Sequence, residues 1–233
     1  MNNNLLQLKI KQRLNKLSSM DYDNIECWQV QEAFNKAQLE WVRRQLNGIN
    51  LKKEGAEQSV TKVDDLQVLL EEEPLNGFTY ARYFESEQLP ENYMRFIKVS
   101  ARCQSDCCPD RKLTVNLIEE ANADSYLTDV FSKPSFEWGE TFCTMMGNRV
   151  RIYTDGQFTL VKPILSYYRK PKEVLFSSCV NPSTGEVSIK DQVCEFKDDI
   201  AEIIIDDACS ILSGDIENMG QLQRLSQTAE KNN

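Results

Sequence analysis

The chain of 233 residues contains no histidine. Its absence excludes Ser–His–Asp and Cys–His catalysis, and it excludes every metal site that depends on imidazole. No stretch approaches the roughly 18 consecutive apolar residues of a membrane-spanning helix. The N-terminal segment is interrupted by Gln and Lys every few residues, so it also lacks the apolar core of a signal peptide. We therefore expect an intracellular product with no membrane partner.

Basic residues are also fewer than acidic ones. The chain has 27 Lys and Arg against 36 Asp and Glu, a formal net charge of -9. This balance argues against a protein whose main task is to neutralise nucleic-acid phosphates. A chain of this length buries enough apolar surface to fold without disulfide bonds. The eight cysteines are therefore expected to act as small apolar residues in a reducing compartment.

Proline divides the chain, because all seven prolines lie between Pro74 and Pro182. Apolar residues recur at helical spacing on both sides of this region, which predicts helices near residues 6–17, 25–47, 60–73 and 198–225. Inside it, alternating patterns predict strands that begin near Phe78, Phe96, Leu113, Val150 and Phe158. Asp155-Gly156 between the last two of these strands is typical of a tight hairpin.

These patterns predict an α+β fold in which the N- and C-terminal segments form a helical bundle. The bundle is expected to comprise residues 1–75 and 196–233. An antiparallel β-rich domain, residues 76–195, is expected to be inserted into it.

Charge is segregated along the chain. Residues 1–20 hold four basic residues and no acid, whereas residues 198–233 hold eight acids and two basic residues. The basic face around Lys9 and Arg13 is therefore expected to meet something acidic. Residues 149–172 are basic again. Opposed patches of this kind can pair within one fold or between copies in a ring, and the sequence leaves both possibilities open.

No catalytic, cofactor-binding or metal-binding residue is assigned. Cys103, Cys107 and Cys108 are the densest group of potential metal ligands. A zinc site would need a fourth ligand, from Cys143, Cys179 or Cys194, so we predict a turn with reduced thiols instead.

The Asp64-Asp65 and Asp206-Asp207 pairs are weak evidence for a carboxylate or magnesium site. Neighbouring helix residues point about 100° apart, so one member of each pair is expected on a solvated face. The glycines form no phosphate-binding motif.

Three stretches resemble virion proteins of short-tailed bacteriophages, and most closely the head–tail connector or ring proteins of the crAss-like group. They are residues 13–48, residues 134–171 (PSFEWGETFC onward) and residues 206–233 (DDACSILSGD onward). The resemblance implies a structural protein, with no active site, that forms a ring of about twelve copies beneath the portal. Its partners would be its own copies, the portal protein and adjacent tail rings. It would be made in the host cytoplasm and located in the virion. DNA would pass through the ring without specific binding.

Two alternatives belong to other classes. The first is a metal-dependent or carboxylate hydrolase of the cell wall, which would use a pair of Asp or Glu residues. The second is an intracellular adaptor unrelated to virions. The polar tail, residues 226–233, is expected to gain order only from a partner.

Overall fold

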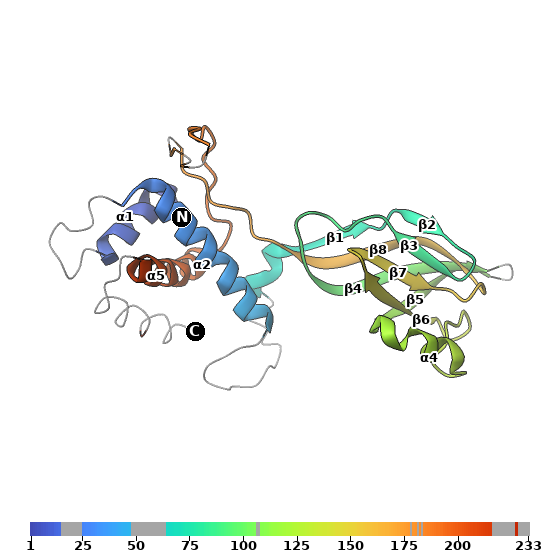
Figure 1. Cartoon of the computed structure of the whole chain (residues 1–233). Helices are drawn as coiled ribbons and strands as arrows, with labels where there is room; N and C mark the ends of the chain where they lie inside the picture. The colour runs from blue at the N-terminus through green and yellow to red at the C-terminus, as the bar shows by residue number, and fades with distance from the viewer. Residues whose placement is uncertain are drawn as a thin grey trace. The chain divides into compact units, whose positions relative to one another are not determined.

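The computed structural model describes residues 1–14, 25–47, 64–105, 108–177, 179–180, 182, 184–215 and 227. These residues form two compact units (Figure 1). Unit 1 comprises the described parts of residues 1–68 and 171–233, and unit 2 comprises Leu69–Lys170. The two ends of the chain therefore share one unit, and the middle of the chain forms the other.

Unit 1 is built mainly from the helices α1 (Asn3–Leu14), α2 (Cys27–Asn47) and α5 (Asp198–Asp215). Helix α5 packs against both α1 and α2 (Figure 1). Helical spacing explains the apolar core, because each helix buries one stripe of residues. The fully buried members of this core include Leu6, Ile10, Leu14, Phe34, Ala37, Val42, Ile204, Ile205 and Ala208.

An extended stretch of unit 1 is docked along α2 by side-chain amides. Gln38 donates to the carbonyl of Lys172 at 2.9 Å, and Asn35 pairs with both backbone groups of Val174. The backbone N–H of Phe176 donates to Gln31 at 3.0 Å. The three amides lie on one face of the helix. Alternate residues of an extended chain point to one side, so Lys172, Val174 and Phe176 meet successive amides along the helix. We call Gln31, Asn35 and Gln38 the amide row.

A disulfide continues the amide row. Cys27 lies one helical turn before Gln31, and it is bonded to Cys179 with a Cα–Cα distance of 5.8 Å. The expectation that all cysteines remain thiols is therefore wrong for this pair. Cys103, Cys143, Cys194 and Cys209 are buried, as expected for small apolar residues.

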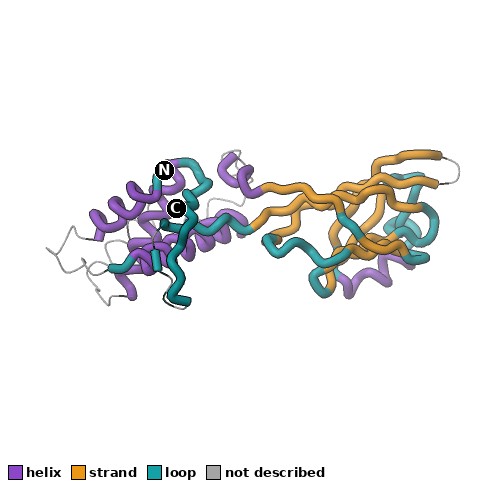
Figure 2. The backbone as a smooth tube through the Cα atoms, turned by 90° about the horizontal axis from the view of Figure 1, so that it is seen from above, coloured by secondary structure: helices purple, strands orange, loops and turns teal. Residues whose placement is uncertain are grey.

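Unit 2 is an eight-stranded sheet in the order β1-β8-β4-β5-β6-β7-β3-β2. Its strands are β1 (Leu70–Pro74), β2 (Gly77–Thr79), β3 (Tyr83–Ser86), β4 (Tyr93–Ser105), β5 (Cys108–Leu117), β6 (Glu140–Met146), β7 (Arg149–Tyr153) and β8 (Thr159–Arg169). All neighbours are antiparallel except β5 and β6. A parallel pair needs a long crossover, which here contains η2 (Glu120–Asn122) and α4 (Ala123–Thr128) (Figure 2).

The sheet curls over itself and so provides its own core. One cluster of buried side chains combines Phe84 of β3 and Ile152 of β7 with Val99 of β4 and Tyr167 of β8. These strands lie in opposite halves of the strand order, so their inner faces meet only in a curled sheet.

A polar cluster fixes the edge strand β1 to this core. The buried hydroxyl of Tyr167 donates to Glu71 at 3.1 Å, and Arg169 pairs with the same carboxylate at 2.9 Å. Burial and the neighbouring carboxylates raise the pKa of Tyr167 to about 12, so the hydroxyl remains a donor at neutral pH.

The predicted fold class, a helical bundle with an inserted β domain, is wrong. The structure is α+β, but its dominant element is the single curled sheet, and the helices are few. Strands β4 and β8 have 13 and 11 residues, much longer than the short segments predicted. Long strands can bend across a core, so the sheet becomes the main structure.

The predicted hairpin at Asp155-Gly156 is also wrong. The turn exists, with φ of 49° at Asp155 and 71° at Gly156. However, β7 pairs with β6 and β3, whereas β8 pairs with β4 and β1. The turn carries the chain between two distant places in the strand order, because β8 pairs along the 13-residue strand β4 rather than with the five-residue strand β7.

The helix predicted over residues 60–73 ends early. In its described part, a helical turn at residues 64–66 and η1 (Gln67–Leu69) lead directly into β1, which contains Glu71, Glu72 and Glu73. Glu71 pairs with Tyr167 and Arg169, and the pairing of β1 with β8 outweighs the helix propensity of this segment.

The strand predicted from Phe78 is two strands, β2 and β3. They approach closely at Gly77, where a Cβ atom would lie 2.1 Å from the Glu85 carbonyl oxygen. Helix α5 ends at Asp215, and the rest of the predicted helix to residue 225 lies outside the described residues, as does the tail except for Gln227.

Candidate functional site

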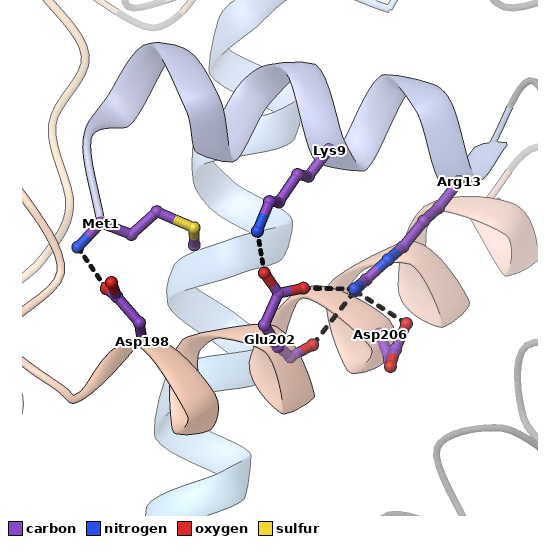
Figure 3. Close-up of polar contacts among 6 residues, drawn as sticks. All are labelled: Met1, Lys9, Arg13, Asp198, Glu202 and Asp206. Atoms are coloured by element: carbon purple, nitrogen blue, oxygen red, sulfur yellow. Dashed lines mark hydrogen bonds and ion pairs between the residues drawn. The ribbon is translucent and has the colours of Figure 1, made fainter.

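The opposed charge patches of the two chain ends meet inside unit 1 (Figure 3). Lys9 and Arg13 of α1 both pair with Glu202 of α5, and Arg13 also lies 2.8 Å from Asp206. The N-terminal amine lies 2.7 Å from Asp198 and holds the pKa of that carboxyl below its usual range. The expectation that this basic face meets acids is confirmed, and the structure uses it to join α1 to α5.

Glu202 is the acid that α1 depends on most, because it receives both Lys9 and Arg13. We predict that Glu202→Gln lowers the free energy of unfolding by about 1–2 kcal/mol, since two partly exposed ion pairs are lost. Urea denaturation at low and high salt measures this, with the larger difference expected at low salt. Glu186→Gln, at an exposed acid of the same unit, is the control and should change little. Equal stabilities for Glu202→Gln and wild type would contradict the prediction.

The two Asp pairs join structural elements. Asp206 pairs with Arg13 of α1, whereas Asp207 pairs with Arg44 of α2. Both carboxylates are largely buried, so the expectation that one of them is solvated is wrong. Burial raises the pKa of Asp207, and Arg44 opposes this shift. Their roughly 100° separation on α5 directs them to two different helices.

The other Asp pair shares one lysine. The ammonium of Lys197 contacts Asp64 and lies 3.6 Å from Asp65. This contact joins the described residues before unit 2 to the start of α5.

The cysteine group is described only in part. Cys103 is buried in β4, and its thiol donates to the Arg111 carbonyl at 3.4 Å. Cys107 and the side chain of Cys108 lie outside the described residues. Among the residues that are described, no three His, Cys, Asp or Glu side chains are grouped to hold a metal ion. The metal-free cluster remains a prediction.

Three large apolar side chains project into solvent from the connection between α4 and β6. Val130, Phe131 and Trp138 are 72%, 94% and 80% exposed. We call these three residues the apolar tip. Its backbone is well held, because the Asp129 carboxylate accepts from Ser132 and from the N–H of Phe131.

Acids flank the apolar tip on both sides. Asp129 precedes Val130, and Glu137 precedes Trp138, and both acids are exposed. The hydrogen bonds that Asp129 accepts lower the pKa of its carboxyl, so it is ionised at neutral pH. The apolar tip therefore combines exposed aromatic surface with negative charge.

A second surface of unit 2 has the opposite charge. A groove of about 590 Å³ lies over β4, β5 and β8 and is lined by Arg102, Lys112 and Lys162, with Val161 and Ile164 among its apolar residues. We call it the basic groove. Arg151, another cation of the basic stretch 149–172, lies outside the groove and contacts Glu85 and Glu120.

Unit 1 also has a pocket, of about 770 Å³, between α2 and the chain docked along it. Trp28 and Cys179 lie in its wall together with Glu32, Lys36 and Glu173. Glu186 lines it as well, so its charged residues are three acids and one lysine and its wall is mainly acidic.

Comparison with known proteins adds no family assignment: no protein-family model matches the chain, and no curated protein matches it either. The resemblance to phage connector proteins therefore stays a prediction. Within the described part of the chain, every helix is too short or too polar to cross a membrane.

Sequence reasoning missed both surfaces of unit 2 and the amide row. Val130, Phe131 and Trp138 follow no regular period, so nothing distinguishes them from buried loop residues. The basic groove brings together cations that are about 60 residues apart in the sequence. The amide row did leave a signal, since three amide side chains occur at helical spacing between apolar residues.

Proposed function

We propose that this chain is a non-enzymatic structural subunit of a bacteriophage virion that forms one ring of the head–tail connector. Its partners are neighbouring copies, the portal protein and adjacent tail proteins, and DNA passes through the ring without specific binding. The observation that carries an assembly role is the apolar tip. The particular assembly follows from the sequence resemblance.

The apolar tip supports an assembly role because water is a poor environment for such a surface. Single exposed apolar residues are common, but three large ones in one well-held loop mark a contact site. Aromatic residues with few rotatable bonds dominate binding energy at protein interfaces. The net charge of -9 also suits a conduit through which DNA slides.

The experiment measures assembly of the full chain, alone and with its portal protein, by light scattering and negative-stain imaging. Wild type is expected to form closed rings, at least on the portal. Phe131→Ser/Trp138→Ser is expected to weaken assembly at least about a hundredfold, because two buried aromatic contacts are lost at each interface. The melting temperature should stay the same, since both side chains are exposed in the single chain.

Ile189→Ser provides a matched control, because Ile189 of unit 1 is 94% exposed, like Phe131. This variant should assemble as wild type does. Wild type that remains monomeric with portal present would overturn the proposal. Release of fragments from peptidoglycan by wild type would favour the cell-wall hydrolase instead.

A further inference from the structure

Positive charge is concentrated in the basic groove. Arg102 of β4 lies directly opposite Lys112 of β5, and on its other side it pairs with Val161, next to Lys162. Neighbouring strands are about 4.8 Å apart, so the three cations are spread over about 10 Å. Positive charge gathered in this way attracts an anionic occupant.

The groove also offers an apolar surface. Val161 and Ile164 line it, and both are more than one-third exposed. A purely anionic ligand would leave these side chains in contact with water or with charge. The groove therefore fits an occupant that is both apolar and acidic.

We propose that the basic groove receives the apolar tip of a second copy of this chain. The inference rests on the proposed ring function and identifies the contact between neighbouring subunits. Phe131 and Trp138 would cover Val161 and Ile164, while Asp129 and Glu137 would lie against the groove cations. The tip thus supplies both properties that the groove requires.

The tip does not occupy the groove of its own chain. Its side chains are exposed to between 72% and 94%, which is incompatible with insertion into any described part of the same molecule. A nucleic acid is a poorer match for the groove than the tip is. Duplex backbone presents phosphate and sugar, which would not cover the apolar lining residues, and the chain carries an excess of nine negative charges.

Two different surfaces on one subunit define a head-to-tail contact. Such a contact propagates from copy to copy, because each subunit has one tip and one groove left for the next. The result is a closed ring when the rotation between copies divides a full turn, and a filament otherwise.

The test uses two variants that each keep one half of the contact. Lys112→Glu/Lys162→Glu loses the groove but keeps the tip, and Phe131→Ser/Trp138→Ser keeps the groove. Each variant alone is expected to be monomeric, with affinity reduced at least about a hundredfold. Mixing the two should give a one-to-one dimer by light scattering, because each pair forms one intact contact and cannot grow further.

Lys98→Glu/Lys190→Glu is the control, because it makes the same change in net charge at two exposed lysines outside the groove. It should assemble as wild type does. Normal rings from Lys112→Glu/Lys162→Glu would overturn this inference and leave the ring function standing. Monomeric wild type on the portal would instead overturn the ring function itself. Duplex DNA that binds wild type but not Lys112→Glu/Lys162→Glu, with assembly unchanged, would assign the groove to nucleic acid.

Discussion

Trp41→Ala is expected to lower the free energy of unfolding of unit 1 by about 3–5 kcal/mol. The Trp41 side chain is 3% exposed on α2, and its ring packs edge-on against Phe196 at a centroid distance of 5.2 Å. The truncation removes this buried surface and leaves a cavity that the surrounding helices fill only in part. Urea denaturation followed by far-ultraviolet circular dichroism measures the loss, because most of the described helix belongs to unit 1.

Trp138→Ala is the control for this substitution. The chemical change is identical, but Trp138 is 80% exposed in the apolar tip, so its effect on a single chain should stay within about 0.5 kcal/mol. The two tryptophans therefore have opposite roles, with Trp41 stabilising the fold and Trp138 stabilising the assembly. Equal losses of stability for the two variants would contradict this assignment.

Helices of unit 1 could be predicted because their signal is local. Leu6, Ile10 and Leu14 recur at the helical period, and the structure buries all three. The same period places Phe34 and Trp41 of α2 in the core. Trp28 fits the period as well, yet it is only half-buried and lines the pocket of unit 1, because it lies at the first turn of the helix.

Strand pairing could not be predicted in the same way. The alternation in β7 and β8 indicates two strands, but it carries no information about which neighbours they choose. Local turn chemistry at Asp155-Gly156 favours a hairpin, and the long-range pairing of β8 with β4 outweighs it. Contacts between residues far apart in sequence decide the topology, so the curled sheet was missed, together with β1 and β6, although strands were predicted where β4, β5, β7 and β8 lie.

The candidate surfaces also depend on contacts that the sequence does not show. Asp206 and Asp207 are neighbours in sequence, yet they bind arginines of two different helices, which only the packing of α5 determines. Likewise, Lys112 and Lys162 come together because β4 lies between β5 and β8. Charge segregation along the chain correctly predicted that the basic N-terminal helix meets acids. It could not predict that the acids belong to the same molecule.

Removing the disulfide by Cys27→Ser/Cys179→Ser is expected to lower the stability of unit 1 by about 4 kcal/mol. The bond joins residues 152 positions apart, and a fully unfolded loop of that size would give about 5 kcal/mol from chain entropy. Unit 2 shortens the effective loop while it remains folded, because β1 and β8 hold its two ends side by side, with Leu70 opposite Tyr168. Only about 50 unfolded residues then close the loop, which reduces the estimate to about 4 kcal/mol.

Reductant separates this effect from local damage by the two serines. Wild type in excess dithiothreitol should unfold at the same urea concentration as Cys27→Ser/Cys179→Ser, and dithiothreitol should not change the variant further. Cys209→Ser, which alters a buried cysteine of the same unit outside the Cys27–Cys179 pair, should respond to dithiothreitol as wild type does. If reduced wild type kept its full stability, the amide row alone would hold residues 171–177 on α2, and the covalent bond would add nothing to hydrogen bonds worth about 1 kcal/mol each.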